Sequence, residues 1–139
     1  MSAALFQRKI NYSAHQLEVK PSLIHGQGVF SKTVFRSGQL IEKAPVILID
    51  DAEKELLTNS SLHHYYFLVN DTAKPIAMGL GYSALYNHAV DANAGYSIDI
   101  INLYITIKAC KKIAAGEEIT INYNGRPGDS SLVYFSNNN

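Results

Sequence analysis

The chain has 139 residues, of which 47% are hydrophobic. This length and composition suit one folded domain with a buried core rather than a disordered segment. Twelve basic and twelve acidic residues give a formal net charge of zero. Because a basic excess is the usual footprint of nucleic-acid binding, we expect no direct contact with nucleic acid. The single cysteine, Cys110, excludes an intramolecular disulfide and a zinc site made of several cysteines.

The N-terminal residues 1–9 lack the long apolar region of a signal peptide. No stretch approaches the ~18–20 apolar residues that a membrane span needs. We therefore expect a soluble intracellular protein without a membrane partner, cytoplasmic if bacterial and with access to the nucleus if viral or eukaryotic. The five histidines show no His-x-x-x-His spacing, so no bound metal is expected.

The first half of the chain predicts several short strands. Leu17–Lys20 alternates apolar and polar residues, as a half-buried strand does, and Val29–Ser31 resumes extended structure after two glycines. Gln39–Glu42 and Val46–Ile49 predict two further strands. We expect Pro45 to separate these two strands, because proline cannot donate a hydrogen bond to a sheet.

A helix is expected next. Asp50 can cap it, and Glu53 stands three residues later, which is a variant of the capping box. This helix should end near Thr58. His63–Leu68 predicts either a second short helix or a strand, and Asn70–Asp71 predicts a turn.

The clearest strand of the chain is 103–109, where apolar residues alternate with polar ones. Ile98 and Ile100 alternate before it, and Asn102 lies near the reversal, so a hairpin is expected. Ile119–Ile121 predicts another short strand. Many short strands with one or two short helices indicate a mostly β domain of the α+β class.

Two segments carry residues suited to binding. His25–Phe30 holds two glycines one residue apart, which let the backbone approach a ligand closely, although a simple turn is the commoner meaning of such a pair. Leu85–Asn93 holds Asn87 and His88 side by side. On an extended segment these two side chains point in opposite directions and serve different purposes. A polar turn with a hydrogen-bonded histidine is the alternative for this pair.

A third segment, 116–124, ends with Tyr123. Taken together and in this order, the three segments resemble the signature segments of the SET-domain lysine methyltransferases. The middle segment keeps the Asn-His pair and the final Asn of the family pattern Asn-His-Ser-Cys-x-Pro-Asn. The third matches Glu-Glu-[Leu/Ile]-Thr-x-x-Tyr, with Asn122 where Asp is commoner. The resemblance runs from about Leu17 to Tyr123 and is greatest to the short free-standing members known from viruses and bacteria.

The resemblance implies a SET-type fold of several small curved sheets with a C-terminal pseudoknot. It implies a single domain over residues 1–139, with a core of about 17–124 and a C-terminal segment, 125–139, that closes a lysine channel. The implied activity is transfer of a methyl group from S-adenosylmethionine to the side-chain amine of a lysine in a protein, with S-adenosylhomocysteine as product. Histones are the family's usual substrates. A homodimer is also implied, because the viral relative is one.

The resemblance also assigns roles to individual residues, several of them aromatic. A core position is the alternative for Tyr65, Tyr66 and Tyr82, and an ordinary tyrosine at a strand end is the alternative for Tyr123. The residues implied are Tyr123 as the catalytic residue; Tyr65, with Tyr66 as its alternative, Tyr82 and Tyr134 for substrate binding; and His25, Gly26, Gln27, Gly28, Tyr86, Asn87, His88 and Tyr123 for cofactor binding.

Tyrosines suit this chemistry because the leaving group is a neutral thioether, so positioning matters more than acid–base catalysis. The attacking lysine must be neutral although its ordinary pKa is ~10.4, and burial beside a sulfonium charge favours loss of its proton. Two alternatives stay open on the sequence: a SET-like module that binds cofactor or peptide with little or no catalysis, and a structural β domain.

Overall fold

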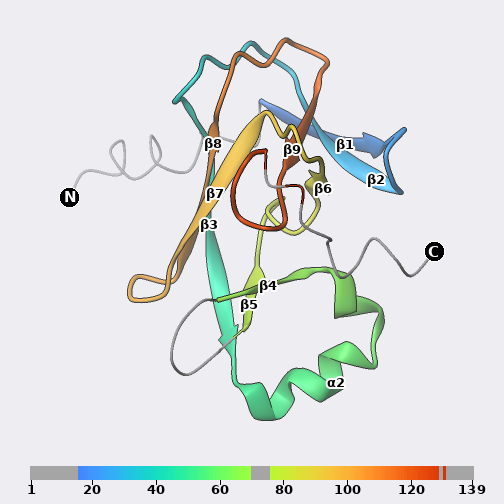
Figure 1. Cartoon of the computed structure of the whole chain (residues 1–139), viewed down its shortest axis with the longest axis vertical. Helices are drawn as coiled ribbons and strands as arrows, with labels where there is room; N and C mark the ends of the chain where they lie inside the picture. Colours follow the sequence, from blue (N-terminus) through green and yellow to red (C-terminus); the bar gives the residue numbers. More distant parts are fainter. Residues whose placement is uncertain (1–15, 70–75, 129, 131–139) are drawn as a thin grey trace, which may run out of the picture.

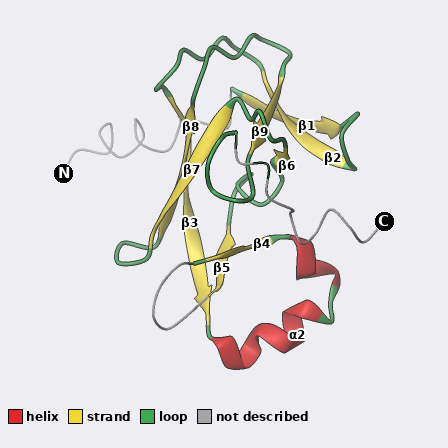
Figure 2. Ribbon diagram, in the orientation of Figure 1, coloured by secondary structure: helices red, strands yellow, loops and turns green. Residues whose placement is uncertain are grey.

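The computed structural model describes residues 16–69, 76–128 and 130. These residues form two β-sheets and a short helical insert that lies at one end of the molecule (Figures 1 and 2). The strands and the curled sheets confirm the mostly β class and the SET-type fold expected from the sequence. The turn expected at Asn70–Asp71 and the candidate residue Tyr134 lie outside the described residues.

The smaller sheet has four strands in the order β1-β2-β9-β6. β1 and β2 form an antiparallel hairpin, in which Leu17 lies opposite Ser31. β9 pairs antiparallel with β2 on one edge and parallel with β6 on the other. The bounds are β1 (Leu17–Pro21), β2 (Gln27–Ser31), β6 (Asn87–His88) and β9 (Glu118–Ile121).

The larger sheet has five antiparallel strands in the order β4-β5-β3-β8-β7. The hairpin of β7 and β8 is the one predicted. Asp99 closes its turn, because Oδ1 accepts hydrogen bonds from the backbone N–H groups of Ile101 and Asn102 at 3.0 and 2.9 Å. The bounds are β3 (Leu40–Ile49), β4 (Tyr66–Leu68), β5 (Ile76–Gly79), β7 (Ala94–Asp99) and β8 (Tyr104–Ala109).

The expected separation of two strands at Pro45 is wrong, since β3 runs through it without a break. The reason is a change of partner. β3 pairs with β8 as far as Pro45, which lies opposite Tyr104, and pairs with β5 from Val46 onward. Pro45 is therefore the last residue of one ladder, and its carbonyl still accepts a hydrogen bond from Leu80 N–H at 2.9 Å.

The helical insert joins β3 to β4. It consists of a 3₁₀ turn η1 (Asp51–Glu53), a short helix α2 (Lys54–Thr58) and a second 3₁₀ turn η2 (Ser61–His64). The helix ends at Thr58 as predicted, but the expected cap is wrong, because the Asp50 side chain makes no capping hydrogen bond. The segment His63–Leu68, expected as either helix or strand, contains the end of η2 and all of β4.

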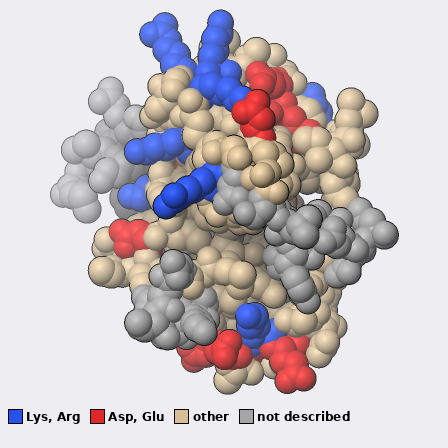
Figure 3. Space-filling model, viewed as in Figure 1, with Lys and Arg blue, Asp and Glu red and all other residues tan. Residues whose placement is uncertain are grey.

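Most Lys and Arg side chains in the view of Figure 3 lie on the part of the molecule away from the helical insert, where acidic side chains lie beside them, and further acidic side chains lie on the insert with a basic one among them. Exposed Lys111 and Lys112 come just after β8. None of the described helices is long and apolar enough to cross a membrane.

The core lies between the two sheets and includes Phe35, which is fully buried. Phe35 pairs with Ile113 in an isolated antiparallel bridge, through two backbone hydrogen bonds of 2.9 Å. This bridge joins the turn before β3 to the turn before β9. The core thus links the larger sheet to β9, the strand within the third signature segment.

We predict that Phe35→Ala lowers the free energy of unfolding by ~3–5 kcal/mol, because it leaves a cavity in a fully packed region. The matched control is Val34→Ala, at a neighbouring side chain that is 47% exposed, and this change should stay within ~0.5 kcal/mol. Urea denaturation measures both. Equal effects of the two substitutions would contradict this account of the core.

Candidate active site

Strand β9 brings the three signature segments together (Figure 1). On one edge, Val29 of β2 lies opposite Ile119, which places the Gly-x-Gly segment beside β9. On the other edge, Asn87 and His88 of β6 run parallel to Thr120 and Ile121. Tyr123 follows β9 after one residue. Residues that are distant in the sequence therefore surround one short strand.

The side-chain amide of Asn87 fastens β6 to the Gly-x-Gly segment. Its Nδ2 donates to the carbonyl oxygens of His25 and Gln27 at 3.0 and 3.1 Å and to Oε1 of Glu118 at 2.8 Å. The amide oxygen takes no part in these bonds. Asn87 therefore shapes the candidate cofactor site with its nitrogen and can offer its oxygen to a ligand.

Glu118 is a site residue that the sequence reasoning missed. Its carboxylate accepts the hydrogen bond from Asn87 and also binds the Ser22 hydroxyl. The Ser22 oxygen lies 2.9 Å from Glu118 Oε1 and 2.8 Å from Oε2. A Cβ on Gly28 would lie 2.2 Å from Glu118 Oε1 and 3.1 Å from Asn87 Nδ2. Only glycine leaves this approach open, which explains the second glycine of the pair. The Glu-Glu pair in the third segment was the signal that could have identified Glu118.

His88 serves a different purpose from Asn87, as the extended backbone predicted. Its Nδ1 accepts a hydrogen bond from the backbone N–H of Tyr123 at 3.0 Å. A ring nitrogen that accepts carries no proton, so the neutral ring has its hydrogen on Nε2. Burial lowers the pKa of His88 below its ordinary value of 6.5, which favours this neutral form.

The hydroxyl of Tyr123 donates a hydrogen bond of 2.8 Å to the backbone carbonyl oxygen of Tyr86. Burial, followed by the nearby Tyr65 and the negative charge of Glu118, raises the pKa of Tyr123 to about 12. The phenol is therefore neutral at physiological pH. Because its proton is committed to Tyr86, the oxygen lone pairs of Tyr123 remain to face a substrate.

The side chain of Tyr86, a residue assigned to cofactor binding, lies in the core. Its side chain is 1% exposed, and its hydroxyl donates to Glu42 Oε1 at 3.1 Å inside the core. Only the backbone of Tyr86 reaches the candidate site, through the carbonyl that accepts from Tyr123. Its sequence position, just before Asn87, gave no indication of the buried partner.

Tyr65 and its alternative, Tyr66, have different surroundings in the structure. Tyr65 is 41% exposed and lies close enough to Tyr123 to raise the pKa of that residue. Tyr66 begins β4, is buried, and meets the ring of His63 edge to face at 6.1 Å. Tyr65 is thus the better placed of the two to contact a substrate at Tyr123.

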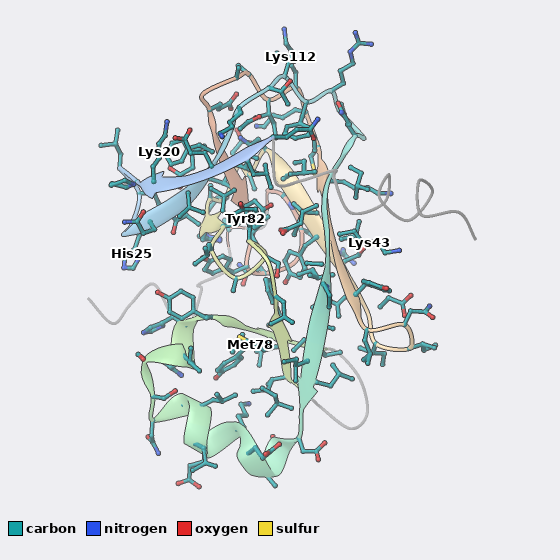
Figure 4. The ribbon with its side chains drawn as sticks, turned by 180° about the vertical axis from the view of Figure 1, so that it is seen from behind. Lys20, His25, Lys43, Met78, Tyr82 and Lys112 are labelled. Carbon is teal, nitrogen blue, oxygen red and sulfur yellow. The ribbon has the colours of Figure 1, made fainter. Side chains whose placement is uncertain are left out.

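Tyr82 lies on the loop between β5 and β6. In the view of Figure 4 it lies in the centre of the molecule, between Met78 and the β1–β2 hairpin that carries His25 at its tip. Its backbone N–H donates to Glu42 Oε2 at 2.9 Å, and its half-buried ring packs against the core. Tyr82, a candidate substrate-binding residue, is therefore held in place through its backbone.

Two further residues near the site escaped the sequence reasoning. Tyr96 of β7 directs its hydroxyl at the carbonyl oxygen of Tyr123, at 3.4 Å, and its ring lies 4.9 Å from that of Phe67. Asn93 fixes the loop after β6 to β9, because its side chain donates to Glu118 O at 2.8 Å and accepts from Thr120 N–H at 2.9 Å. The alternation of β7 and the final Asn of the middle segment were the available signals.

The chain that leaves β9 stays against the loop that follows His88. Ala89 N–H donates to Ile121 O at 3.1 Å, and Gly128 N–H donates to Val90 O at 2.7 Å. β9 thus lies between β2 and β6, and the chain after it runs along the loop that follows His88. Within the described ranges there is no group of three or more His, Cys, Asp or Glu residues that could hold a metal ion.

Comparisons with known proteins agree with this geometry. The SET domain family matches residues 26–124. A relative from Schizosaccharomyces pombe, a histone-lysine N-methyltransferase specific for histone H3 lysine 37, is 28% identical over 108 residues, which cover 77% of this chain and 72% of the relative. The crystal structure of a candidate histone methyltransferase from Plasmodium falciparum superposes with a TM-score of 0.64 at 27% identity, covering 78% of this chain and 92% of that one.

The fold and these matches place the chain among proteins of a lysine methyltransferase family. The chain belongs to the SET domain family, as the resemblance of its three signature segments indicated.

We predict that the stability contributed by neutral His88 is fully present above about pH 6.5. It should be lost as the pH falls from there through the lowered folded pKa, because the unfolded state takes up the proton first. Thermal melting from about pH 5 to about pH 8 measures this.

The control for that experiment is His88→Asn, whose amide oxygen can accept from Tyr123 N–H but does not titrate. The difference between the two melting curves isolates His88 from the other histidines. Parallel curves for the two proteins would exclude His88 as the titrating group.

Proposed function

We propose that the protein is an S-adenosylmethionine-dependent protein-lysine N-methyltransferase. The observation that carries this proposal is the hydrogen bond from the Tyr123 hydroxyl to the Tyr86 carbonyl, next to the Asn87–His88 pair. It gives the candidate catalytic phenol one orientation and one protonation state. Membership of a family whose cofactor is S-adenosylmethionine supports the proposal.

The residues present fit this cofactor. Gly28 leaves the backbone of the 25–28 segment free of side-chain obstruction at the point where Glu118 and Asn87 approach it. Asn87 Oδ1 can accept from an ammonium group, and the His88 Nε2–H can donate. Glu118 supplies a negative charge nearby, which suits a ligand that carries positive charge. When bound, the cofactor supplies an electrophilic methyl group on a sulfonium centre.

The chain's own residues then position the reaction. The neutral Tyr123 oxygen, with its proton held by Tyr86, presents lone pairs that can orient the lysine nitrogen and the methyl hydrogens. Tyr65 lies beside it and supplies an aromatic wall. Removal of the lysine from water favours the neutral amine that attacks. Alignment of the amine with the methyl group lowers the barrier without a strong acid or base.

A histone is the proposed substrate, because the relatives from Schizosaccharomyces pombe and Plasmodium falciparum are named for histone methylation. The homodimer, the single domain over 1–139 and the closing of the lysine channel by residues 125–139 remain predictions. One observation supports the last of these: the hydrogen bond of Gly128 to Val90 leaves the chain beside the loop that follows His88.

The experiment that tests this function has two parts. Calorimetric titration with S-adenosylmethionine, and with S-adenosylhomocysteine for comparison, should show one saturable site. Methyl transfer to histone-tail lysine peptides should then be detected by mass spectrometry. Binding without transfer to histone or other lysine peptides would favour a non-catalytic SET module, and the absence of binding would overturn the cofactor assignment.

We predict that Tyr123→Phe lowers kcat about 100-fold, because it removes the oxygen that positions the reacting groups. The affinity for S-adenosylmethionine should change less than about twofold, since the ring and backbone of Tyr123 remain. The matched control is Tyr104→Phe, on the outer face of β8, where the side chain is 38% exposed. Unchanged turnover in the Tyr123 variant would remove this hydroxyl from the mechanism.

A further inference from the structure

A buried carboxylate, Glu42 of β3, lies in the core without a role in any of the three signature segments. Its side chain is 3% exposed. Its described partners are a hydroxyl and a backbone N–H rather than a cation: Oε1 accepts from Tyr86 at 3.1 Å and Oε2 accepts from Tyr82 N–H at 2.9 Å. Burial of an acid with neutral partners costs free energy, so such a group is expected to serve a purpose beyond packing.

The local backbone is shaped to receive this carboxylate. Gly81 has a φ of +63°, and a Cβ there would lie 2.6 Å from Glu42 Oε2. The same loop is held to β3 by the bond from Leu80 N–H to Pro45 O, and it is closed by the Ser83 hydroxyl, which donates to Leu80 O at 2.7 Å. The loop that leads to Tyr86 is therefore built around Glu42.

Two hydrogen bonds, joined through the covalent frame of Tyr86, connect Glu42 with the candidate catalytic hydroxyl. Glu42 holds the Tyr86 hydroxyl, and the backbone carbonyl of Tyr86 accepts from the Tyr123 hydroxyl at 2.8 Å. We propose that Glu42 is a positioning residue, which fixes Tyr86 so that its carbonyl sets the direction of the Tyr123 hydroxyl. Glu42 touches neither substrate nor cofactor in this role.

This inference rests on the proposed function, because it assumes that Tyr123 is the catalytic hydroxyl. Two variants test it. Glu42→Gln keeps the shape of the side chain but turns an amide nitrogen toward one of the two donors. Tyr86→Phe removes the hydroxyl that Glu42 binds and leaves the backbone carbonyl in place. Either variant should lower kcat about tenfold, with the affinity for S-adenosylmethionine within about twofold of wild type.

A purely structural role is separated from positioning by repeating both changes in a Tyr123→Phe background. If Glu42 acts through the Tyr123 hydroxyl, Glu42→Gln should cause no further fall in kcat once that hydroxyl is absent. A second tenfold fall in that background, or an unchanged kcat in the single variants, would overturn the proposal. The matched control is Glu55→Gln, at an exposed position of α2, which should leave kcat unchanged.

A readout that does not require turnover distinguishes this proposal from the proposed function. Tyrosine labelled with ¹³C at Cζ gives an NMR signal for each tyrosine, and the signal missing from Tyr123→Phe is that of Tyr123. The chemical shift of this signal should change in Glu42→Gln, although Glu42 and Tyr123 share no hydrogen bond. If the Tyr123 signal shifts but the protein methylates no substrate, Glu42 positions Tyr123 and the proposed function is rejected. A Tyr123 signal that stays in place would reject the positioning.

Discussion

The site depends on one strand that is paired on both edges. β9 has β2 on one side and the two-residue strand β6 on the other. Since β6 pairs with only two residues, its position needs more than a ladder of backbone bonds. Side chains supply the rest, with Asn87 bound across β9 to the Gly-x-Gly segment and Asn93 bound along it. These strand pairings and side-chain hydrogen bonds fix the position of Tyr123, which follows β9.

The sequence predicted the features that local patterns encode. Strict alternation in 103–109 identified β8 and its hairpin with β7, and the order of three short motifs identified the family. Tyr123 was assigned by its place in a motif, and its catalytic role stays a prediction; the structure shows that its hydroxyl donates to the Tyr86 carbonyl. Adjacent residues on an extended segment were expected to differ in purpose, and Asn87 and His88 do differ.

The features that the sequence did not predict depend on contacts between distant residues. Pro45 was expected to break a strand, and only the change of partner from β8 to β5 explains why it does not. Glu42 lies between Ile41 and Lys43, where an exposed acid would be ordinary, and its burial follows from the loop that wraps it. The inward direction of the Tyr86 side chain depends on the same loop.

The double pairing of β9 also affects the order in which the molecule can be completed. Ser22 and Glu118, which are hydrogen-bonded to each other, lie 96 residues apart in the chain. Closing so long a loop is costly in entropy, and contacts of this kind slow folding. During synthesis, β1 to β8 leave the ribosome before β9. The candidate site therefore does not exist in the nascent chain until β9, the last described strand, has docked between β2 and β6.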